Sequence, residues 1–465
     1  MATGERPPEN RPEKRKVKVV VIGAGATGLV TAYLLARSGA EVTVVEGASR
    51  SGGLLGTFDV GEGQLLEHFY HHFFTHDAEM NWLLGELRLE DSVFYRQTSM
   101  GVFRDGRINP FDGMGDLLKF RPIGLPDRLR FGFSSAMLAY LDKYGDKEDV
   151  SCLAWFDRWA GRKATDAIWR PLLKIKFGDA AEKIPLAWMA GRLRQRARSR
   201  KAGSEQLGYI RGSLQVLVDR LVDELRELGG TIRTGTPVER LLVQRGQVAG
   251  VATGADNIWA DRVVATVPTS VLADLVRDED RQYAEQLDRI KYIAAMCTVL
   301  SLKEPLSPVY WTNVTDPGYD FGGVIEHTNF VPAEEYGGRH LVYLSRYLGT
   351  DDPLWSMDDD RLLDRQLNQL GKMYGRNVRP LLERSWIFRA RHGATMTDMG
   401  FHEKIPRMDS PLKNLLVASM CHIYPDERSV NNSIRVAAEA VRHLNLEKTA
   451  DEVPRGLSFS AKYAA

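Results

Sequence analysis

The chain is poor in cysteine and carries no excess of either charge. Its three cysteines, Cys152, Cys297 and Cys421, are odd in number and far apart, so they supply neither a disulfide framework nor a zinc motif. Lys and Arg together number 62 and Asp and Glu 61, which excludes a general electrostatic attraction to nucleic acid. We therefore expect a cytoplasmic protein without a nucleic-acid partner.

Long hydrophobic runs are also scarce. Residues 19–36 carry no formal charge, but three glycines in six residues and a change from a β-branched to a helical pattern argue against a membrane span. The stretch Met1–Lys16 is polar and has no apolar core of the kind a signal peptide needs. We expect no transmembrane span, and flexible tails at residues 1–15 and 449–465.

The first strong pattern is a strand, a glycine turn and a helix. Val17–Ile22 reads as a buried parallel strand, and Gly23-Ala24-Gly25-Ala26-Thr27-Gly28 follows at once. Leu29–Ser38 has helical spacing, and Glu41–Glu46 is a second apolar strand that ends in an acid. This is the full βαβ context that the GxGxxG fingerprint of a Rossmann dinucleotide site requires.

Each residue type in this pattern has a physical reason. Gly23 permits the tight turn, Gly25 lets the backbone approach a pyrophosphate, and Gly28 allows close packing of helix on strand. Ala26 and Thr27 lie at the helix N-terminus, which faces the phosphates. Glu46 is placed to bind a ribose hydroxyl.

A second glycine turn follows the acid, as Gly47-Ala48-Ser49-Arg50-Ser51-Gly52-Gly53. It resembles the E-x-x-x-R-x-G-G continuation of the amine oxidase superfamily, flavoproteins that include monoamine oxidase, protoporphyrinogen oxidase and phytoene desaturase. The resemblance implies FAD as cofactor, with bare backbone beside its ribityl and pyrophosphate groups. Many members have an arginine after the two glycines, where this chain has Leu54. The FAD contacts expected in this segment are Glu46, Gly47, Arg50, Gly52, Gly53 and Leu54.

Two later segments fit the same superfamily. The helix expected at 214–228 leads to a strand at 231–234 and a hairpin turning near 245–246, and the resemblance gives Val238 a backbone contact to adenine. A strand at 414–420 and a helix from 429 to 443 resemble the closing motif. In that motif a strand end meets the ribityl chain and the helix N-terminus points at the flavin ring. The residues carried over are Ser419, Met420, Arg428, Val430 and Asn431.

The closest resemblance is to bacterial protoporphyrinogen-oxidase-like proteins, through the blocks Glu67–His72, Trp169–Gly178 and Tyr424–Arg428. It implies an α/β fold, with a Rossmann-type FAD-binding domain assembled from discontinuous segments and an α+β substrate domain. The FAD-binding domain is expected at 16–75, 205–270 and 403–448, and the substrate domain at 76–204 and 271–402.

Four of the ten histidines cluster between Glu67 and His76. A helix would place His68, His72 and His76 on one face, but no further well-spaced ligand supports a metal site, so we expect none. Histidines beside the flavin could instead orient substrate or move protons, or serve as structural histidines below it. The candidate catalytic residues are His68, His71, His72 and Lys176.

Cations are dense in Trp169–Gly178 and again in residues 192–201. They form either a solvated basic face or an anion clamp for a phosphate- or carboxylate-bearing substrate. Arginines at alternating positions would line up on an extended segment but spread around a helix. The candidate substrate-binding residues are Arg170, Lys174, Arg192 and Arg194.

The sequence predicts an FAD-dependent oxidoreductase that removes hydride from a C–N or C–C bond of a small or lipid-like substrate, which the cations would suit if it is anionic. The alternative is a non-redox flavoenzyme acting on a nucleotide sugar, similar to UDP-galactopyranose mutase. The arginine density and the segment 324–330 favour it, whereas the mutases' tyrosine-rich C-terminal motif is not evident. A FAD-binding protein without turnover, a homodimer and peripheral contact with a membrane stay open.

Overall fold

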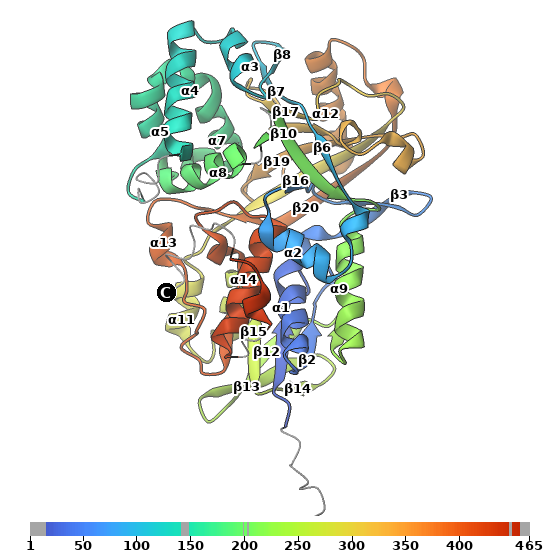
Figure 1. Ribbon diagram of the computed structural model, residues 1–465, viewed down its shortest axis with the longest axis vertical. Helices are drawn as coiled ribbons and strands as arrows, with labels where there is room; N and C mark the ends of the chain where they lie inside the picture. The colour runs from blue at the N-terminus through green and yellow to red at the C-terminus, as the bar shows by residue number, and fades with distance from the viewer. Residues whose placement is uncertain (1–14, 141–147, 199, 202–203, 446–448, 456–465) are drawn as a thin grey trace, which may run out of the picture.

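The computed structural model describes residues 15–140, 148–198, 200–201, 204–445 and 449–455. A parallel sheet with its covering helices forms the lower half of the molecule, and a large, mostly antiparallel sheet with a group of helices forms the upper half (Figure 1). The chain passes between the halves several times, so each is built from segments far apart in sequence.

The parallel sheet has five strands in the order β11-β2-β1-β15-β21. Its central strand is Val-rich and buried on both faces, as expected when helices and a second sheet cover it. The bounds are β1 Lys18–Ile22, β2 Glu41–Val45, β11 Thr231–Arg233, β15 Arg262–Ala265 and β21 Leu415–Val417. All four pairings are parallel, which confirms the α/β class.

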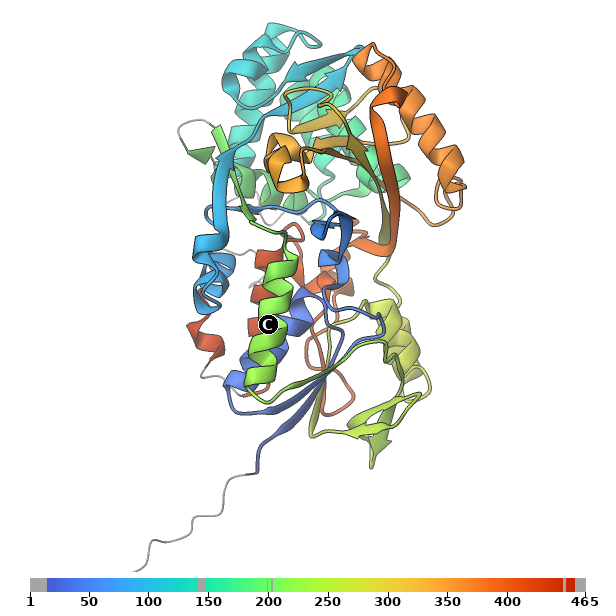
Figure 2. The same cartoon turned by 90° about the vertical axis from the view of Figure 1, so that its right-hand side faces the viewer.

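Helices cover one face of this sheet and a small antiparallel sheet covers the other (Figure 2). The helices are α1 Ala26–Arg37, α2 Ala78–Glu86, α9 Gln215–Glu227 and α14 Val430–His443; the strands of the small sheet are β12 Val238–Gln244, β13 Gln247–Thr253 and β14 Asn257–Trp259. Helix α2 lies beyond the domain boundary predicted at residue 75, yet its Met80 and Leu83 pack into the same core as Leu29 of α1.

The upper half is built on a seven-stranded sheet in the order β20-β16-β19-β18-β17-β7-β8. Its strands are β7 Met100–Arg104, β8 Arg107–Pro110, β16 Tyr292–Leu302, β17 Trp311–Val314, β18 Gly323–Glu326, β19 His340–Leu348 and β20 Leu382–Thr395. Helix α12 (Asp359–Tyr374) packs beside it through Leu367 and Leu370.

A group of helices with its own apolar core stands beside this sheet (Figure 1). They are α3 Met114–Lys119, α4 Leu125–Tyr140, α5 Cys152–Phe156, α6 Arg162–Ala164, α7 Arg170–Phe177 and α8 Leu186–Arg198. Helices α10 Thr269–Val276 and α11 Arg281–Leu287 pack into a core with the parallel sheet of the lower half. The remaining shorter elements are β3 Thr57–Gly61, β4 Gln64–Glu67, β5 Phe73–Phe74, β6 Val93–Gln97, β9 Arg200–Lys201, β10 Ser204–Ile210 and α13 Phe401–Lys404.

The predicted tails are described only in part. Residues 1–14 and 456–465 lie outside the described residues. The start of the C-terminal tail is packed rather than free, because Thr449 donates its hydroxyl to the Leu34 carbonyl at 2.9 Å and Ala450 and Val453 are buried in the lower core. No helix in the described part of the chain is long and apolar enough to cross a membrane.

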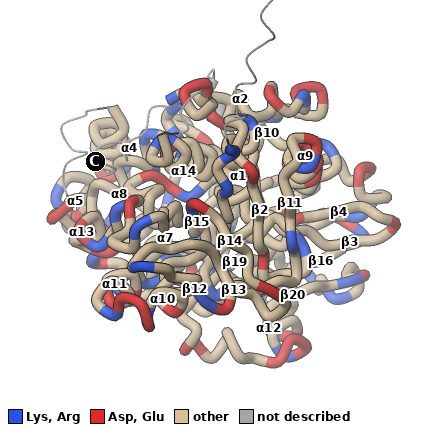
Figure 3. Tube along the Cα trace, turned by 90° about the horizontal axis from the view of Figure 1, so that it is seen from below, with Lys and Arg blue, Asp and Glu red and all other residues tan. Residues whose placement is uncertain are grey.

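Formal charges of both signs are interspersed over the molecule in the view from below (Figure 3). This agrees with the net charge of +1. Local groups of charge therefore matter more than a global field.

Candidate functional site

The loop between β1 and α1 has the backbone of a phosphate cradle. Gly23 has φ +102, and a Cβ on Gly28 would lie 1.9 Å from the Gly23 carbonyl oxygen, so both positions exclude larger residues. A Cβ on Gly25 meets nothing within 4 Å. Two glycines are thus needed for the turn itself, and the third leaves open space at the N-terminus of α1, where a pyrophosphate fits.

The second glycine turn docks onto the first. The Gly52 N–H donates to the Ala24 carbonyl at 2.8 Å. A Cβ on Gly53 would lie 3.2 Å from Gly25 Cα, and Gly52 and Gly53 have φ of +122 and +57. The two turns form one continuous strip of backbone, which fits an extended dinucleotide.

Glu46 ties this strip together. Its carboxylate accepts from the Ala24 N–H at 2.7 Å and from the Ala48 N–H at 2.8 Å. The Thr236 N–H donates to the Glu46 carbonyl at 2.8 Å, which brings Pro237 and Val238 of the adenine-side segment next to it. The ribose contact stays a prediction, to which the structure adds a role for Glu46 in shaping the loop.

The surroundings of Leu54 explain why this chain has a leucine where many members of the superfamily have an arginine. Leu54 is partly buried against the same apolar cluster as Phe58 and Tyr70, so a charged residue there would lose its solvation. Arg50 is exposed at the edge of the strip.

Helix α14 points its N-terminus out of the lower half. It begins at Val430, and Ser429 caps it by accepting from the Asn432 N–H at 3.1 Å. The Asn431 amide is used elsewhere, because it binds the Glu79 carboxylate and the Met80 N–H at 2.9 Å each. Any contact of Asn431 with the flavin is therefore left to its backbone, whereas the sequence predicts a contact without distinguishing the two.

Ser419 and Met420 lie where β21 ends, as predicted. Ser419 is buried, and its N–H donates to His422 Nδ1 at 3.1 Å. Met420 lines a narrow cavity between the two halves, together with Lys176, Trp188, Glu427 and Arg428. The predicted ribityl contacts by Ser419 and Met420 stay predictions.

A half-buried cation lies among aromatic rings at this junction. Arg428 donates to the Tyr347 hydroxyl at 2.8 Å, and its guanidinium lies 5.8 Å from the centre of that ring. Burial raises the pKa of Tyr70, whereas Arg428 and Lys176 outweigh burial at Tyr347 and lower its pKa. The cluster is therefore a cationic, partly desolvated site suited to an anion.

His71 faces the same cation in its neutral form. Burial first, and then the positive charge of Arg428, lower the pKa of His71 to about 3. Its Nδ1 donates to the Phe69 carbonyl at 2.6 Å, which leaves Nε2 as an acceptor. The imidazole can thus accept a hydrogen bond from a ligand but holds a proton poorly near neutral pH.

Glu427 joins the helical group to this site. Its carboxylate binds Lys176 of α7 at 2.8 Å and also pairs with Arg192 of α8. Burial raises the pKa of Glu427, but Arg192 and Lys176 outweigh it and hold the pKa well below its usual range. Helix α8 can approach this closely because a Cβ on Gly191 would lie only 3.0 Å from the Pro425 carbonyl oxygen.

The histidine segment is not a helix, contrary to one reading of its spacing. Residues 68–72 are irregular and β5 follows, so His68, His72 and His76 do not share a helical face. His68 stacks on Phe388 with ring centres 4.3 Å apart, and burial lowers its pKa. His72 packs edge-on against Phe74. No group of three or more metal-binding side chains occurs among the residues that the structure describes.

The predicted substrate cations separate into different roles. Arg170 is paired with the carboxylates of Asp157, Asp166 and Glu182. Lys174 is exposed. Of the two arrangements left open for the basic run, the structure has the helix up to Arg198, the end of α8; Arg194 is buried in it, and Arg196 contacts Met100 Sδ at 3.1 Å. Of the predicted cations, Lys176 and Arg192 reach the cavity edge through Glu427.

Sequence reasoning missed Tyr70, Tyr347 and Glu427 as members of the site. Tyr70 and Glu427 lie in the blocks Glu67–His72 and Tyr424–Arg428, on which the resemblance to protoporphyrinogen-oxidase-like proteins rests. Their adjacency in sequence to His71 and Arg428 could have identified them. Tyr347 has no such signal, because it lies on β19 and meets Arg428 only through folding.

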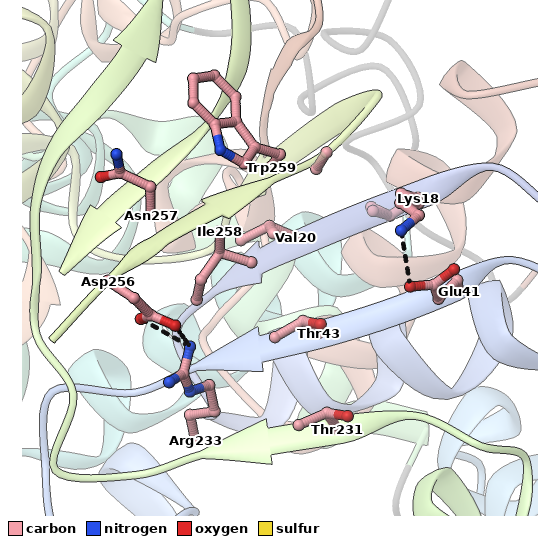
Figure 4. A pocket seen from close by; sticks show the side chains of 12 residues that line it. Lys18, Val20, Glu41, Thr43, Thr231, Arg233, Asp256, Asn257, Ile258 and Trp259 are labelled. Atoms are coloured by element: carbon pink, nitrogen blue, oxygen red, sulfur yellow. Dashed lines mark hydrogen bonds and ion pairs between the residues drawn. The ribbon is translucent and has the colours of Figure 1, made fainter.

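The structure has a second hollow that is separate from this site (Figure 4). It has a volume of about 390 Å³ and lies between the parallel sheet and β14, where Lys18 pairs with Glu41 and Arg233 with Asp256. Its lining residues include none of the glycines of the cradle.

Comparison with known proteins agrees with this geometry. The sequence profile described as flavin-containing amine oxidoreductase matches residues 26–441. The flavin-dependent L-tryptophan oxidase RebO of Lentzea aerocolonigenes is 27% identical over 77% of this chain and 80% of its own length. A structure from Exiguobacterium sp. 255-15 with a provisional protoporphyrinogen oxidase name aligns with TM-score 0.74 and 16% identity, over 93% of this chain and all of that one.

Reduced UDP-galactopyranose mutase aligns with TM-score 0.72 and 16% identity over 94% of this chain and 96% of its own, which shows a shared fold. FAD is the usual flavin of the matched family, and the glycine cradle fits it. The chain is an FAD-dependent enzyme that belongs to the flavin-containing amine oxidoreductase family.

Proposed function

We propose that the protein is an FAD-dependent oxidoreductase that removes hydride from a C–N or C–C bond of a substrate bearing an anionic group. The observation that carries this proposal is the half-buried pair of Arg428 and Tyr347, in which Arg428 lies two residues before the start of α14. Flavin, when bound, accepts the hydride.

The chain's own residues bind and orient the substrate. Arg428 offers a partly desolvated positive charge, which is worth more here than in water, and Tyr347 adds a hydroxyl beside it. His71 offers a neutral acceptor on the same side. Tyr70 and Trp311 meet edge to face at 4.7 Å and provide an apolar wall that excludes water.

The matched relatives support a redox reaction but disagree on its substrate. RebO is named for oxidation of L-tryptophan, which carries a carboxylate, and a relative from Narcissus pseudonarcissus is named a 15-cis-phytoene desaturase. The cationic cluster favours the first kind of substrate, because a hydrocarbon has nothing to pair with Arg428.

The non-redox alternative loses part of its motivation. The arginines from Arg192 to Arg198, which would have lined up on an extended segment, lie on a helix, and the segment 324–330 has structural partners. His327 binds the Tyr336 hydroxyl at 2.8 Å, and Glu326 accepts from the Leu306 N–H at 2.8 Å. The shared fold keeps the alternative testable.

The test is anaerobic mixing of the FAD-loaded protein with L-amino acids, with the matching decarboxylated amines, and with UDP-galactose. We expect a carboxylate-bearing compound to bleach the flavin absorbance and to yield peroxide when air is admitted. Arg428→Gln should lower kcat/KM for that compound roughly ten- to hundredfold, the worth of a charged hydrogen bond, with FAD content unchanged.

Lys176→Gln and Lys174→Gln form a matched pair on one helix, and only the first should alter turnover, because Lys174 is exposed. Equal rates with the amine and the amino acid would contradict the anion site. Sugar isomerisation by the reduced protein, with no bleaching by any compound, would establish the alternative instead.

A further inference from the structure

The outer surface of α3 and α4 is apolar where a solvent-facing helix is normally polar. Phe133 is 66% exposed and Leu129 54%. Together with their neighbours they form what we call the α3–α4 face: Met114, Leu118, Leu125, Leu129, Phe133 and Tyr140. Scattered exposed apolar residues are normal, but a contiguous group marks a binding surface.

The spacing of these residues shows that they form one stripe. Leu125, Leu129 and Phe133 are four residues apart, and Tyr140 follows seven later, so they project from one side of α4. The opposite side of α4 is also apolar, because Phe131 and Leu138 are buried in the core of the helical group. Helix α3 lies against the same helix, since a Cβ on Gly132 would lie 3.0 Å from Met114 Cε.

The charges on this surface have one sign. Of residues 114–140, all of which the structure describes, the exposed charged side chains are Lys119, Arg121 and Arg130. The two acids of the segment are half-buried, and Asp116 accepts from the Asp112 N–H at 3.0 Å. Every exposed residue between Met114 and Tyr140 is therefore apolar, glycine or cationic.

The positive border continues onto the next segment. Arg130 donates to the Arg158 carbonyl at 3.1 Å, which brings that segment against α4. There Trp159 is 40% exposed, with the Arg158 guanidinium 5.9 Å from its ring, and Arg162 and Lys163 are exposed. A tryptophan bordered by cations is the composition typical of a membrane–water boundary.

We propose that the α3–α4 face docks the protein peripherally on an anionic lipid bilayer. The apolar stripe would enter the acyl boundary, and Lys119, Arg121 and Arg130 would meet the lipid phosphates. A second copy of this chain fits less well, because a twofold contact of this face with itself would set cations against cations with no exposed acid between them. The proposal places lipid contact here rather than at the arginines of α8.

The docked face also belongs to the helical group that borders the cavity. Phe131 of α4 stacks on Trp169 with ring centres 5.6 Å apart, and Trp169 immediately precedes α7, which carries Lys176. When the protein is docked, the helical group that contains α4 and α7 would therefore lie between the bilayer and the cavity. The proposal does not depend on the reaction that the flavin performs.

The experiment is co-sedimentation of the FAD-loaded full chain with vesicles of phosphatidylcholine alone and of phosphatidylcholine with one third phosphatidylglycerol. We expect binding to the anionic vesicles and its loss in high salt. Phe133→Gln and Leu129→Gln should each weaken binding roughly tenfold, through lost apolar burial. Lys119→Gln and Arg121→Gln should each weaken it about fivefold.

Trp259→Gln is the matched control, because Trp259 is 50% exposed on β14 at the other end of the molecule. It should bind vesicles like the wild type. Unchanged flavin content and Tm in the variants would exclude misfolding, and the two cation variants test the proposal even if an apolar variant fails to fold. Absence of wild-type binding at low salt, or a dimer that Phe133→Gln turns into a monomer, would overturn the proposal.

Discussion

The carboxylate of Glu427 lies 2.8 Å from the ammonium nitrogen of Lys176. This ion pair joins the segment that precedes α14 to the helical group of the upper half. Arg192 pairs with the same carboxylate from the next helix. The junction of the two halves therefore depends on one acid shared by two cations.

Removing the Glu427 carboxylate should lower the stability of the folded protein. Glu427→Gln leaves Lys176 and Arg192 half-buried without their partner, which should cost about 3 kcal/mol of unfolding free energy. Glu182→Gln is the control in the same helical group, because Glu182 is about half exposed and its pair with Arg170 should contribute less than about 1 kcal/mol. Urea unfolding at neutral pH measures both, and equal losses would show that the Glu427 bridge has no special weight.

The same variant predicts a pH dependence. The pKa of Glu427 is lowered in the folded state by its two cations, so its contribution is fully present above the unfolded value of about 4.3 and is lost as pH falls below it. The difference in unfolding free energy between wild type and Glu427→Gln should thus be constant between about pH 5 and about pH 8, and it should shrink at lower pH. A difference that grows in acid would contradict the assigned direction.

His71 should change stability with pH in the same direction, because its pKa is also lowered in the folded state, but over a higher pH range. Burial and Arg428 hold its pKa at about 3, below the unfolded value of about 6.5, so the unfolded chain binds the extra proton between these limits. Each pH unit lost in that window should cost about 1.4 kcal/mol of stability, and His71→Gln should remove this slope. Parallel curves for the two proteins would mean that folding does not lower the pKa of His71.

Two glycines of the cradle should respond differently to the same change. Gly25→Val should fold and stay largely free of FAD, because its side chain enters the open space expected for the pyrophosphate. Gly28→Val should fail to fold, because its Cβ would collide with the Gly23 carbonyl oxygen. Circular dichroism and flavin absorbance together distinguish the outcomes, and a yellow, folded Gly25→Val protein would refute the placement.

Glu46→Ala should lower FAD affinity roughly ten- to hundredfold while the protein stays folded. The loss combines the predicted ribose contact with the two loop hydrogen bonds to Ala24 and Ala48. Glu41→Ala is the control on the same strand, since Glu41 is exposed and pairs only at the surface with Lys18. Equal FAD titration curves for the two variants would show that Glu46 points away from the cofactor.

The parallel sheet and its glycine loop were predictable because their signals are local. The Val-rich strand, the turn glycines and the acid at the end of β2 are adjacent in sequence, and each follows from backbone geometry. The helix and strand expected at 214–228 and 231–234 likewise match α9 and β11 closely.

The rest of the site depends on contacts between distant segments. Tyr347 and Arg428 meet only after β19 has paired within the antiparallel sheet, and no local pattern fixes that order of strands. The sequence left the basic run open between a helix and an extended segment; the burial of the apolar residues Leu186, Trp188 and Met189 makes α8 a helix.

The last strand of the parallel sheet, β21, begins only at Leu415, and α14 follows it. At about 5–20 residues per second, a ribosome needs about 20 to 80 seconds to translate the first 400 or so residues, and until then the sheet edge and the helix that complete the FAD-binding half are missing. The glycine loop between β1 and α1 is translated early, but β21 and α14 are translated only near the end of the chain. We therefore expect FAD to bind late in the synthesis of each chain, and a chain that ends before Leu415 should be colourless.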